Sequence, residues 1–461
     1  MQPPRSLWWS TIPDVASRSP LAGHRDVDVA IVGGGFTGLW TARELLRRDP
    51  SLHVAVVEAH VCGFGASGRN GGWASALYPQ AAATVIADHG RDAYDHLRHV
   101  LQHAVGELGR AAAEDDIDAD FVHGGTLYAA RTHAQVERLR AEVDHARQIG
   151  VSEADLAWLD REEFAERLTI TGARGGTFSP HCARLNPARL VRGLATAVER
   201  LGATIYEGSP VTRIEPADRH GDSVVATAHG SLHAHYVVRA TEGYTPTVAR
   251  QRRRVVPLYS LMIATAPQST DFWESVGLAH YETFADARHV VIYGQRTSDD
   301  RIAFGGRGAP YHFGSTVEAR FDMNDRVFGL LESTLQELFP GLDAEVTHRW
   351  GGPLAMPRDH SPYVEIDHHR GLAAAGGYTG DGVVLSHVCA TALADLIVDP
   401  DADTAHTRLP FVNHVNRNWE VEPLRWLGIN LGLAAATVAD RSENREGHVS
   451  RASALVARLL H

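Results

Sequence analysis

Residues 33–38, GGGFTG, match the pattern G-x-G-x-x-G through Gly33, Gly35 and Gly38. A short apolar run, VDVAIV, comes directly before the pattern, and a stretch with helical spacing follows it as far as Arg48. In such a strand–turn–helix unit, the first glycine permits a tight turn and the second lets a pyrophosphate approach the backbone. The third lets the helix pack closely on the strand. Free N–H groups at the start of the helix then face the phosphates. The pattern predicts a βαβ unit that binds a dinucleotide.

A carboxylate follows at the distance that such a site requires. The apolar run HVAVVEA (53–59) predicts a second buried strand, and it ends in Glu58 and Ala59. Glu58 lies 20 residues beyond Gly38, where its carboxylate can accept hydrogen bonds from ribose hydroxyls. A negative charge there repels a 2′-phosphate, which argues against NADP. The residue types by themselves leave both FAD and NAD open.

The stretch GFGASGRNGG (63–72) begins five residues after Glu58. Its glycines let main-chain N–H groups point inward, and Ser67, Arg69 and Asn70 supply side-chain donors. Such a loop suits a pyrophosphate or the polar edge of a flavin ring. The alternative interpretation is a surface loop that happens to contain a basic residue.

Three later stretches repeat parts of this pattern. ATEGYT, which includes Thr241, follows an apolar strand and has small residues that allow a close approach to a cofactor. AAAGGYTGDGVV (373–384) reads as strand, glycine turn and helix, so the positive end of the helix can face an anionic group. RWGGPLAMPRD (349–359) combines an arginine, a tryptophan and two glycines. An ordinary β-turn explains the first equally well, and a packed turn with a structural arginine explains the third.

Composition excludes several classes of protein. The net charge is −12 and no basic run is present, which argues against nucleic-acid binding. No lysine occurs in the 461 residues, so every fixed side-chain cation is an arginine and no lysine Schiff base can form. The three cysteines form no CxxC pair and the histidines show no ligand spacing, so we expect no disulfide and no metal. No signal peptide or membrane-spanning run is apparent, and we expect a cytoplasmic protein without a membrane partner.

The order of the predicted elements indicates an α/β (α+β) fold. Nucleotide-binding patterns occur early, in the middle and late, and stretches with antiparallel character, such as 254–267 and 289–297, lie between them. Helices are predicted, among others, over 186–202 and 317–340. We therefore expect a discontinuous Rossmann-type domain with an inserted antiparallel-sheet substrate domain. The boundaries we assign are 26–80, 170–250 and 345–410 for the FAD-binding domain, 81–169 and 251–344 for the substrate domain, and 411–461 for a C-terminal helical extension ending in RASALVARLLH.

Taken together, these stretches resemble a known family. DVAIVGGGFTGLWTARELLRRDPSLHVAVVEA, GASGRNGG, ATEGYT, RWGG and GGYTGDGV occur in the order and spacing of the FAD-dependent amine and amino-acid oxidoreductases of the D-amino acid oxidase superfamily. The leading SLWWSTIPD is similar to the gamma-glutamylputrescine oxidase group within that family. The resemblance covers residues 6 to about 400 and does not specify a substrate.

The resemblance implies an extended FAD, noncovalently bound, held along several segments. Gly33, Gly35 and Gly38 would lie at the pyrophosphate and Glu58 at the adenosine ribose. The other implied contacts are Phe36, Thr37, Ala59, Ser67, Arg69, Asn70, Gly71, Gly72, Val211, Ala240, Thr241, Gly377, Tyr378, Gly380, Asp381, Gly382 and Val383. Relatives often carry a histidine where this chain has Asp381, and a carboxylate there would not stabilise negative charge on a reduced flavin. Cys62 beside the loop is a minor candidate for covalent attachment.

The activity that the resemblance implies is oxidation of a primary or secondary amine, such as an amino acid, a polyamine or a gamma-glutamyl amine. A hydride would pass from the C–H next to nitrogen to flavin N5, and oxygen would reoxidise the flavin. Pocket candidates are Trp73, Tyr259 and Tyr293, with Arg307 and Arg349 as possible carboxylate clamps. For each of these aromatic residues, core packing is the favoured interpretation and substrate contact the alternative. The alternatives are a dehydrogenase that passes electrons to a carrier, and a flavin-binding protein without turnover.

Overall fold

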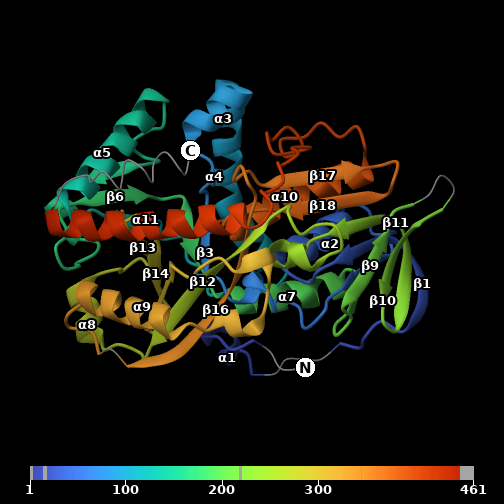
Figure 1. Ribbon diagram of the computed structural model, residues 1–461, viewed down its shortest axis with the longest axis horizontal. Coiled ribbons are helices and arrows are strands. Elements are labelled where there is room, and N and C mark those ends of the chain that lie inside the picture. The colour runs from blue at the N-terminus through green and yellow to red at the C-terminus, as the bar shows by residue number, and fades with distance from the viewer. Residues whose placement is uncertain (1–3, 14–17, 218–220, 344, 447–461) are drawn as a thin grey trace.

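A computed structural model describes residues 4–13, 18–217, 221–343 and 345–446 of the chain. Figure 1 shows two sheets at opposite ends of the long axis, with helices packed around and between them. A small two-stranded ladder joins them. It pairs β3 (Trp73–Ser75) with β7 (Cys182–Arg184) in antiparallel fashion. The predicted α/β class with one parallel and one antiparallel sheet is confirmed.

The first sheet has a parallel centre with the strand order β17-β18-β11-β1-β2-β8. Its strands are β1 (Gly23–Val32), β2 (Val54–Val57), β8 (Thr204–Tyr206), β9 (Val211–Glu215), β10 (Ser223–Thr227), β11 (Gly230–Arg239), β17 (Tyr363–Asp367) and β18 (Leu372–Gly376). The central strands are short apolar runs because both of their faces are covered. Val56 and Ile31, for example, have no exposed surface.

Three helices cover one face of the first sheet. They are α2 (Phe36–Arg48), α7 (Pro187–Arg200) and α10 (Gly382–Val398). Their apolar stripes pack into one core cluster with the strands, including Leu45, Leu194 and Leu393. Asn186 caps α7 by accepting from the N–H of Arg189, and Pro187 occupies its first turn, as the sequence predicts. This packing fixes the start of α2 against the glycine turn.

The second sheet has the order β16-β12-β15-β14-β13-β4-β6-β5 and is antiparallel except at the β13–β4 pair. Its strands are β4 (Thr126–Ala129), β5 (Ala157–Leu159), β6 (Gly176–Ser179), β12 (Val256–Thr265), β13 (Thr283–Asp286), β14 (Ile292–Arg296), β15 (Ile302–Arg307) and β16 (Val346–Met356). Two of these strands, β6 and β16, come from segments that the predicted boundaries place with the FAD-binding domain. The two sheets are therefore interleaved along the chain more finely than the sequence pattern indicates.

The remaining elements are short turns and flanking helices. They are α1 (Leu7–Ser10), α3 (Ala82–His89), α4 (Arg91–Glu114), α5 (His133–Gln148), α6 (Arg161–Ala165), α8 (Thr270–Val276), α9 (Asp325–Leu338) and α11 (Leu424–Glu446), with 3₁₀ turns η1 (Ala66–Gly68), η2 (Glu242–Thr247), η3 (Phe313–Ser315) and η4 (Ala319–Asp322). None of the helices within the described ranges is both long enough and apolar enough to cross a membrane.

Two predicted elements differ from the structure. The helix predicted over 317–340 begins only at Asp325, because the Asn324 side chain accepts from the N–H of Val327 and caps it there. The packed turn, one of the two interpretations of 349–359, is not present, because the stretch is largely strand, within β16. Its glycine at 352 leaves room for a neighbouring side chain, since a Cβ there would lie 3.2 Å from the Cζ of Arg69. Glycine content indicated a turn, but close packing is the reason for it.

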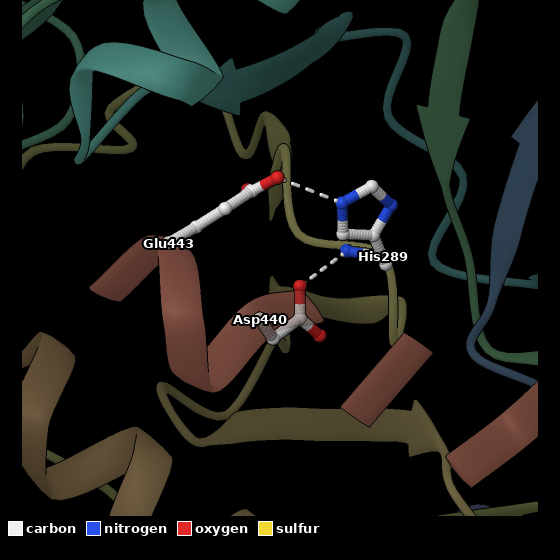
Figure 2. A group of neighbouring side chains, drawn as sticks. All are labelled: His289, Asp440 and Glu443. Atoms are coloured by element: carbon white, nitrogen blue, oxygen red, sulfur yellow. Dashed lines mark hydrogen bonds and ion pairs between the residues drawn. The ribbon is translucent and has the colours of Figure 1, made fainter. Parts of the chain in front are cut away.

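Helix α11 lies along the side of the molecule that carries α5, β13 and β14 (Figure 1). Figure 2 shows how it is fastened: Asp440 accepts from the N–H of His289 at 2.7 Å, and Glu443 lies 3.0 Å from the His289 ring. These three side chains have metal-ligand character, but Arg138 already donates to both Glu443 oxygens at 2.8 and 2.9 Å. We interpret the cluster as an anchor for the helix. The helix expected over RASALVARLLH, 451–461, lies outside the described residues.

Candidate functional site

A first cavity of about 460 Å³ opens at the carboxyl ends of β1 and β2 and reaches the start of α10. Most of the residues predicted to contact FAD line it. They are Gly33, Gly35, Phe36, Thr37, Glu58, Ala59, Ser67, Asn70, Gly71, Val211, Ala240, Thr241, Tyr378, Gly380, Gly382 and Val383. Gly38, Gly72 and Gly377 lie behind this lining, and Arg69 and Asp381 line a neighbouring cavity instead. Segments separated by more than 300 residues thus form one continuous wall.

The glycine turn between β1 and α2 is closed by backbone contacts. Gly33 has φ +115°, and a Cβ on it would collide with the carbonyl oxygen of Ala240. A Cβ at Gly38 would collide with the carbonyl of Gly33. No side chain fits at either position, so the backbone itself forms this end of the cavity. In the first turn of α2 the N–H of Phe36 donates to Ser67, and the N–H groups of Thr37 and Gly38, which have no partner within the helix, are available to an anion.

Glu58 lies beside this turn. Its carboxylate accepts from the N–H of Gly34 at 2.8 Å and from the N–H of His60 at 2.9 Å. Burial raises the pKa of Glu58, while these two hydrogen bonds oppose the shift. The two N–H donors hold the carboxylate at the end of β2, facing the first cavity. This is the position where a carboxylate can accept hydrogen bonds from a ribose.

The loop 63–72 is ordered by its own hydrogen bonds. Ser67, in η1, accepts from the N–H of Phe36 at 2.8 Å and so ties the loop to the start of α2. The Asn70 amide donates to the carbonyl of Ala66 at 3.0 Å, and its oxygen accepts from the N–H of Gly72 at 2.7 Å. None of the residues in the loop is exposed, so the alternative interpretation, a surface loop that happens to contain a basic residue, is wrong.

Arg69 turns away from the first cavity. Its guanidinium donates to Asp322 at 2.7 Å, to the carbonyl of Gly351 at 2.8 Å and to the Tyr244 hydroxyl at 2.9 Å. The side chain is almost fully buried. It joins the loop to η4, β16 and η2. Its predicted contact with FAD stays a prediction.

A second cavity of about 100 Å³ adjoins the first and shares part of its wall. The shared residues are Ala66, Asn70, Gly71, Trp73, Leu354 and Gly380. The second sheet adds polar residues to this lining: Tyr128, Ser260, Tyr293 and Arg307. The Tyr293 and Ser260 hydroxyls are 2.8 Å apart, and the Trp73 and Tyr293 rings meet edge to face. Trp73, Tyr293 and Arg307, three of the predicted pocket residues, are thus brought together.

Asp381 contributes a carboxylate to this second cavity. Burial raises its pKa to about 6, and the positive charge of Arg307 opposes the rise. Arg307 donates to the carbonyl of Thr379 at 2.7 Å, so it is fixed against the same glycine turn. Nearby, the Tyr378 hydroxyl is 2.8 Å from Thr37 on α2. The turn before α10 therefore holds one acid and one cation at the second cavity.

Two predicted pocket residues lie elsewhere. Tyr259 is buried on the opposite face of β12, where its ring contacts His312 and Phe321. Its neighbour Ser260 lines the cavity instead, because successive residues of a strand face opposite sides. Arg349 is exposed and pairs with Glu332 at 2.6 Å. Neither lines the first or the second cavity.

Cys62 has the properties of a packing residue. Its side chain has no exposed surface, and its Sγ lies 2.6 Å from where a Cβ on Gly34 would stand. Burial, with the nearby Glu58 and Glu207, raises the pKa of the thiol well above its usual value. A thiol that does not ionise is a poor nucleophile. The position gives no support to covalent flavin attachment.

Glu242 is a site residue that the sequence analysis did not select. It lines the first cavity, accepts from the N–H of Gly377 at 2.9 Å and from the N–H of Ala355 at 3.3 Å. Burial raises its pKa to about 7. The acid stands within ATEGYT, but only the fold shows that it meets the turn before α10. Tyr128 and Ser260 were missed for the same reason.

A parallel sheet with a phosphate-binding glycine turn, and a cavity that continues into a second sheet, define a dinucleotide-dependent enzyme. The chain belongs to the FAD dependent oxidoreductase family, whose model matches residues 28–396. This match confirms the family that the sequence motifs resemble. FAD is the cofactor, and the residues present fit it, because bare backbone lines the pyrophosphate end and Glu58 faces the cavity where a ribose would bind.

Relatives of known name support this assignment. The chain is 30% identical over 406 residues to the Probable oxidoreductase OrdL of Rhizobium meliloti, covering 86% of this chain and 89% of that protein. It is 29% identical to the Gamma-glutamylputrescine oxidoreductase of Escherichia coli, covering 83% and 86%. Among solved structures, glycine oxidase from Geobacillus kaustophilus matches with a TM-score of 0.69 at 23% identity, over 85% of this chain and 99% of that one. That structural likeness shows the fold.

Proposed function

We propose that this enzyme oxidises a primary or secondary amine at the C–H next to nitrogen, giving an imine. Water hydrolyses the imine to a carbonyl compound and ammonia, or to a carbonyl compound and a primary amine where the substrate is a secondary amine. FAD, when bound, supplies the acceptor for the hydride. The named relatives include a gamma-glutamylputrescine oxidoreductase and glycine oxidases, which supports an amine or amino-acid substrate. The chain's own residues bind the amine, orient it and exclude water.

The observation that carries the proposal is the second cavity, which adjoins the first and shares part of its wall. Trp73 and Gly380 belong to both walls, so a molecule in the second cavity lies against whatever occupies the end of the first. Trp73 and Tyr293 supply apolar surface, and the Tyr293–Ser260 pair supplies hydroxyls. This lining suits a small substrate with an alkyl part and one or two polar ends.

Asp381 gives the second cavity its preference for an amine. Its pKa of about 6 means that it is mostly ionised above neutral pH, when an ammonium group is attracted to it. A carboxylate that accepts the ammonium proton also leaves the neutral amine that loses hydride readily. Arg307 is placed to hold a carboxylate or a carbonyl at the other end of the substrate. We infer a substrate with an amino group and a second, acceptor-bearing end.

We further propose oxygen as the electron acceptor. Arg307 is a fixed cation in the second cavity, and a positive charge there stabilises reduced oxygen as negative charge develops on it. Arg307 would supply this charge in a chain that contains no lysine. Transfer to a separate carrier is the competing outcome.

The test is anaerobic mixing of the FAD-loaded enzyme with a panel of amines. The panel contains N-methyl amino acids, D-amino acids, polyamines and gamma-glutamylated amines. We expect at least one class to bleach the visible flavin absorbance in a saturable manner. Asp381→Asn should slow that bleaching about 10- to 100-fold, since it removes a charge-assisted contact. Asp116→Asn, at a carboxylate whose side chain is 87% exposed, is the matched control and should leave it unchanged.

The opposite results are equally clear. If no amine in the panel bleaches the flavin, amine oxidation is the wrong reaction for this site. If Asp381→Asn behaves like the parent, the carboxylate does not recognise the amine. Reoxidation of the bleached enzyme by oxygen, compared with reoxidation by a dye, then separates an oxidase from a dehydrogenase.

A further inference from the structure

A third cavity of about 140 Å³ lies apart from the flavin and substrate cavities. It is enclosed by α1, the end of β7, the start of α7 and the turn at Thr297–Asp299. None of its lining residues lines the other two cavities. Its wall is largely polar, and two arginines, Arg184 and Arg189, belong to it. The amine-oxidising reaction makes no use of it.

Arg184 is the unusual residue of this cavity. Its side chain is only 5% exposed, yet within the described ranges its guanidinium forms no hydrogen bond and no ion pair, and the buried Nε has no acceptor. Its Cζ lies 4.4 Å from the centroid of the Tyr281 ring. Burial lowers the pKa of Arg184, and the nearby Arg296 adds to that effect. A buried guanidinium almost always has a carboxylate or carbonyl partner, so this one is missing an acceptor.

The surrounding acids are already paired with other arginines. Asp120 accepts from Arg189 at 3.1 Å and from the Ser298 hydroxyl at 2.8 Å. Asp299 is bonded to Arg301 at 2.6 Å, and it also accepts from Thr297. Arg296 and Asp300, which also lie nearby, form an ion pair at 2.6 Å. Asp118 lies 3.6 Å from Arg189 and is mostly exposed.

Arg184 is therefore an unpaired guanidinium, within the described residues, at a cavity whose other charged side chains are paired. Attraction to Asp120 reaches it only at longer range, because no bond joins the two side chains. The planar guanidinium offers parallel N–H donors that match the two oxygens of a carboxylate or phosphate. The cavity is less than a third of the volume of the first one, which restricts the ligand to a small molecule.

We propose that this third cavity is a binding site for a small oxyanion, a carboxylate or a phosphate, held through the Arg184 guanidinium. Arg189, which pairs with Asp120 and Asp118, lines the same cavity. The ligand contacts the elements that support the glycine loop, since Trp8 donates to the carbonyl of Asn70 at 2.8 Å and the Leu185 N–H donates to the carbonyl of Gly72 at 2.8 Å. The site is thus adjacent to the flavin-binding segment but separate from it.

The experiment is isothermal titration of the FAD-loaded protein with sodium phosphate and, separately, with sodium acetate, at constant ionic strength. We expect saturable binding of one anion per chain, and the tighter of the two anions identifies the group that the site takes. Arg184→Gln should weaken that binding about tenfold or more, because it removes a charge-assisted, two-pronged contact. Arg110→Gln, at an arginine whose side chain is 68% exposed, should bind as the parent does.

Two results would overturn the proposal. One is the lack of saturable binding of either anion to the parent protein, and the other is an Arg184→Gln variant that binds as tightly as the parent. Should Arg184→Gln lower the folding stability too far, Arg184→Lys serves instead. It keeps the charge but loses the planar donor pair, so we expect weaker binding with the fold retained. Equal binding by Arg184→Lys would show that the geometry of the guanidinium plays no part.

Discussion

The Arg69 guanidinium donates to the Asp322 carboxylate at 2.7 Å, and this bond joins the glycine loop to the edge of the second sheet. The side chain of Arg69 is 3% exposed and that of Asp322 21%, so the pair lies largely away from water. The guanidinium also donates to the carbonyls of Gly351 and Gly65 and to the hydroxyl of Tyr244. Arg69 therefore supports the junction between the two sheets, whatever contact it makes with FAD.

Breaking this pair should loosen the junction. Asp322→Asn leaves the buried Arg69 cation with neutral acceptors only, and we expect the free energy of unfolding to fall by about 1–3 kcal/mol. Urea unfolding of the FAD-free protein measures it. Asp88→Asn, at an exposed carboxylate on α3, is the control and should change the free energy of unfolding by less than about 0.5 kcal/mol.

Comparing Arg69→Ala with Asp322→Asn separates a structural role of Arg69 from a role in binding FAD. If Arg69 also contacts FAD, Arg69→Ala should weaken FAD binding more than Asp322→Asn does. Equal FAD affinity in the two variants would leave Arg69 with the structural role alone.

The glycine turn allows a matched pair of substitutions. Gly33→Ala requires a left-handed backbone and places a methyl group against the Ala240 carbonyl, so we expect loss of FAD binding and about 1–3 kcal/mol of destabilisation. Gly329→Ala, inside α9 with nothing within 4 Å of the new Cβ, should instead stabilise the protein by about 0.5–1 kcal/mol. Thermal unfolding and FAD titration measure both. A tolerated Gly33→Ala would mean that the turn is not constrained as described.

Glu242 should make stability depend on pH. Its pKa in the folded state is about 7, above the ordinary value of 4.5. Between these values the folded protein binds more protons than the unfolded chain, so stability should fall as pH rises from about 4.5 to 7. The total fall assigned to this group is about 1–3 kcal/mol. This loss of stability is complete at pH 8 and absent at pH 4.

The variant Glu242→Gln cannot ionise and should lose this part of the pH dependence. We would measure the free energy of unfolding of both proteins at several pH values and compare the slopes between pH 5 and 8. The slopes are compared because the amide also changes the hydrogen bonds to Gly377 and Ala355 at every pH. Parallel slopes for the two proteins would contradict the assignment.

The anchor of α11 should respond to loss of one charge. Glu443 is 1% exposed and accepts from Arg138 at 2.8 and 2.9 Å. Glu443→Gln leaves Arg138 without its carboxylate partner, and we expect amide exchange in α11 to quicken about tenfold or more. Arg441→Gln, at an exposed position of the same helix, should leave the exchange rates unchanged. Unchanged protection in Glu443→Gln would show that other contacts hold the helix.

Local motifs were the part of the site that could be predicted from the sequence. Gly33, Gly35 and Gly38 are constrained by covalent geometry and by the approach of a phosphate, so their spacing carries meaning by itself. Glu58 ends an apolar run at a fixed distance from them. The cap of α7 was readable for the same reason, because Asn186 and Pro187 act within one turn. Features of this kind depend on neighbours in the chain alone.

The tertiary structure decides which way a side chain faces and which residues it contacts. Tyr259 and Ser260 are adjacent in the chain, and only the pairing of β12 shows which of them faces the second cavity. Arg69 was predicted to contact FAD, but its ion pair with Asp322, 253 residues away in the chain, is visible only in the fold. Glu242 and Arg184 gain their character from burial, which depends on segments distant in the chain. The sequence determined the family, the cofactor and the backbone that receives it. Packing decided which charges are paired, which are buried and which face a cavity, since those properties arise only when remote strands meet.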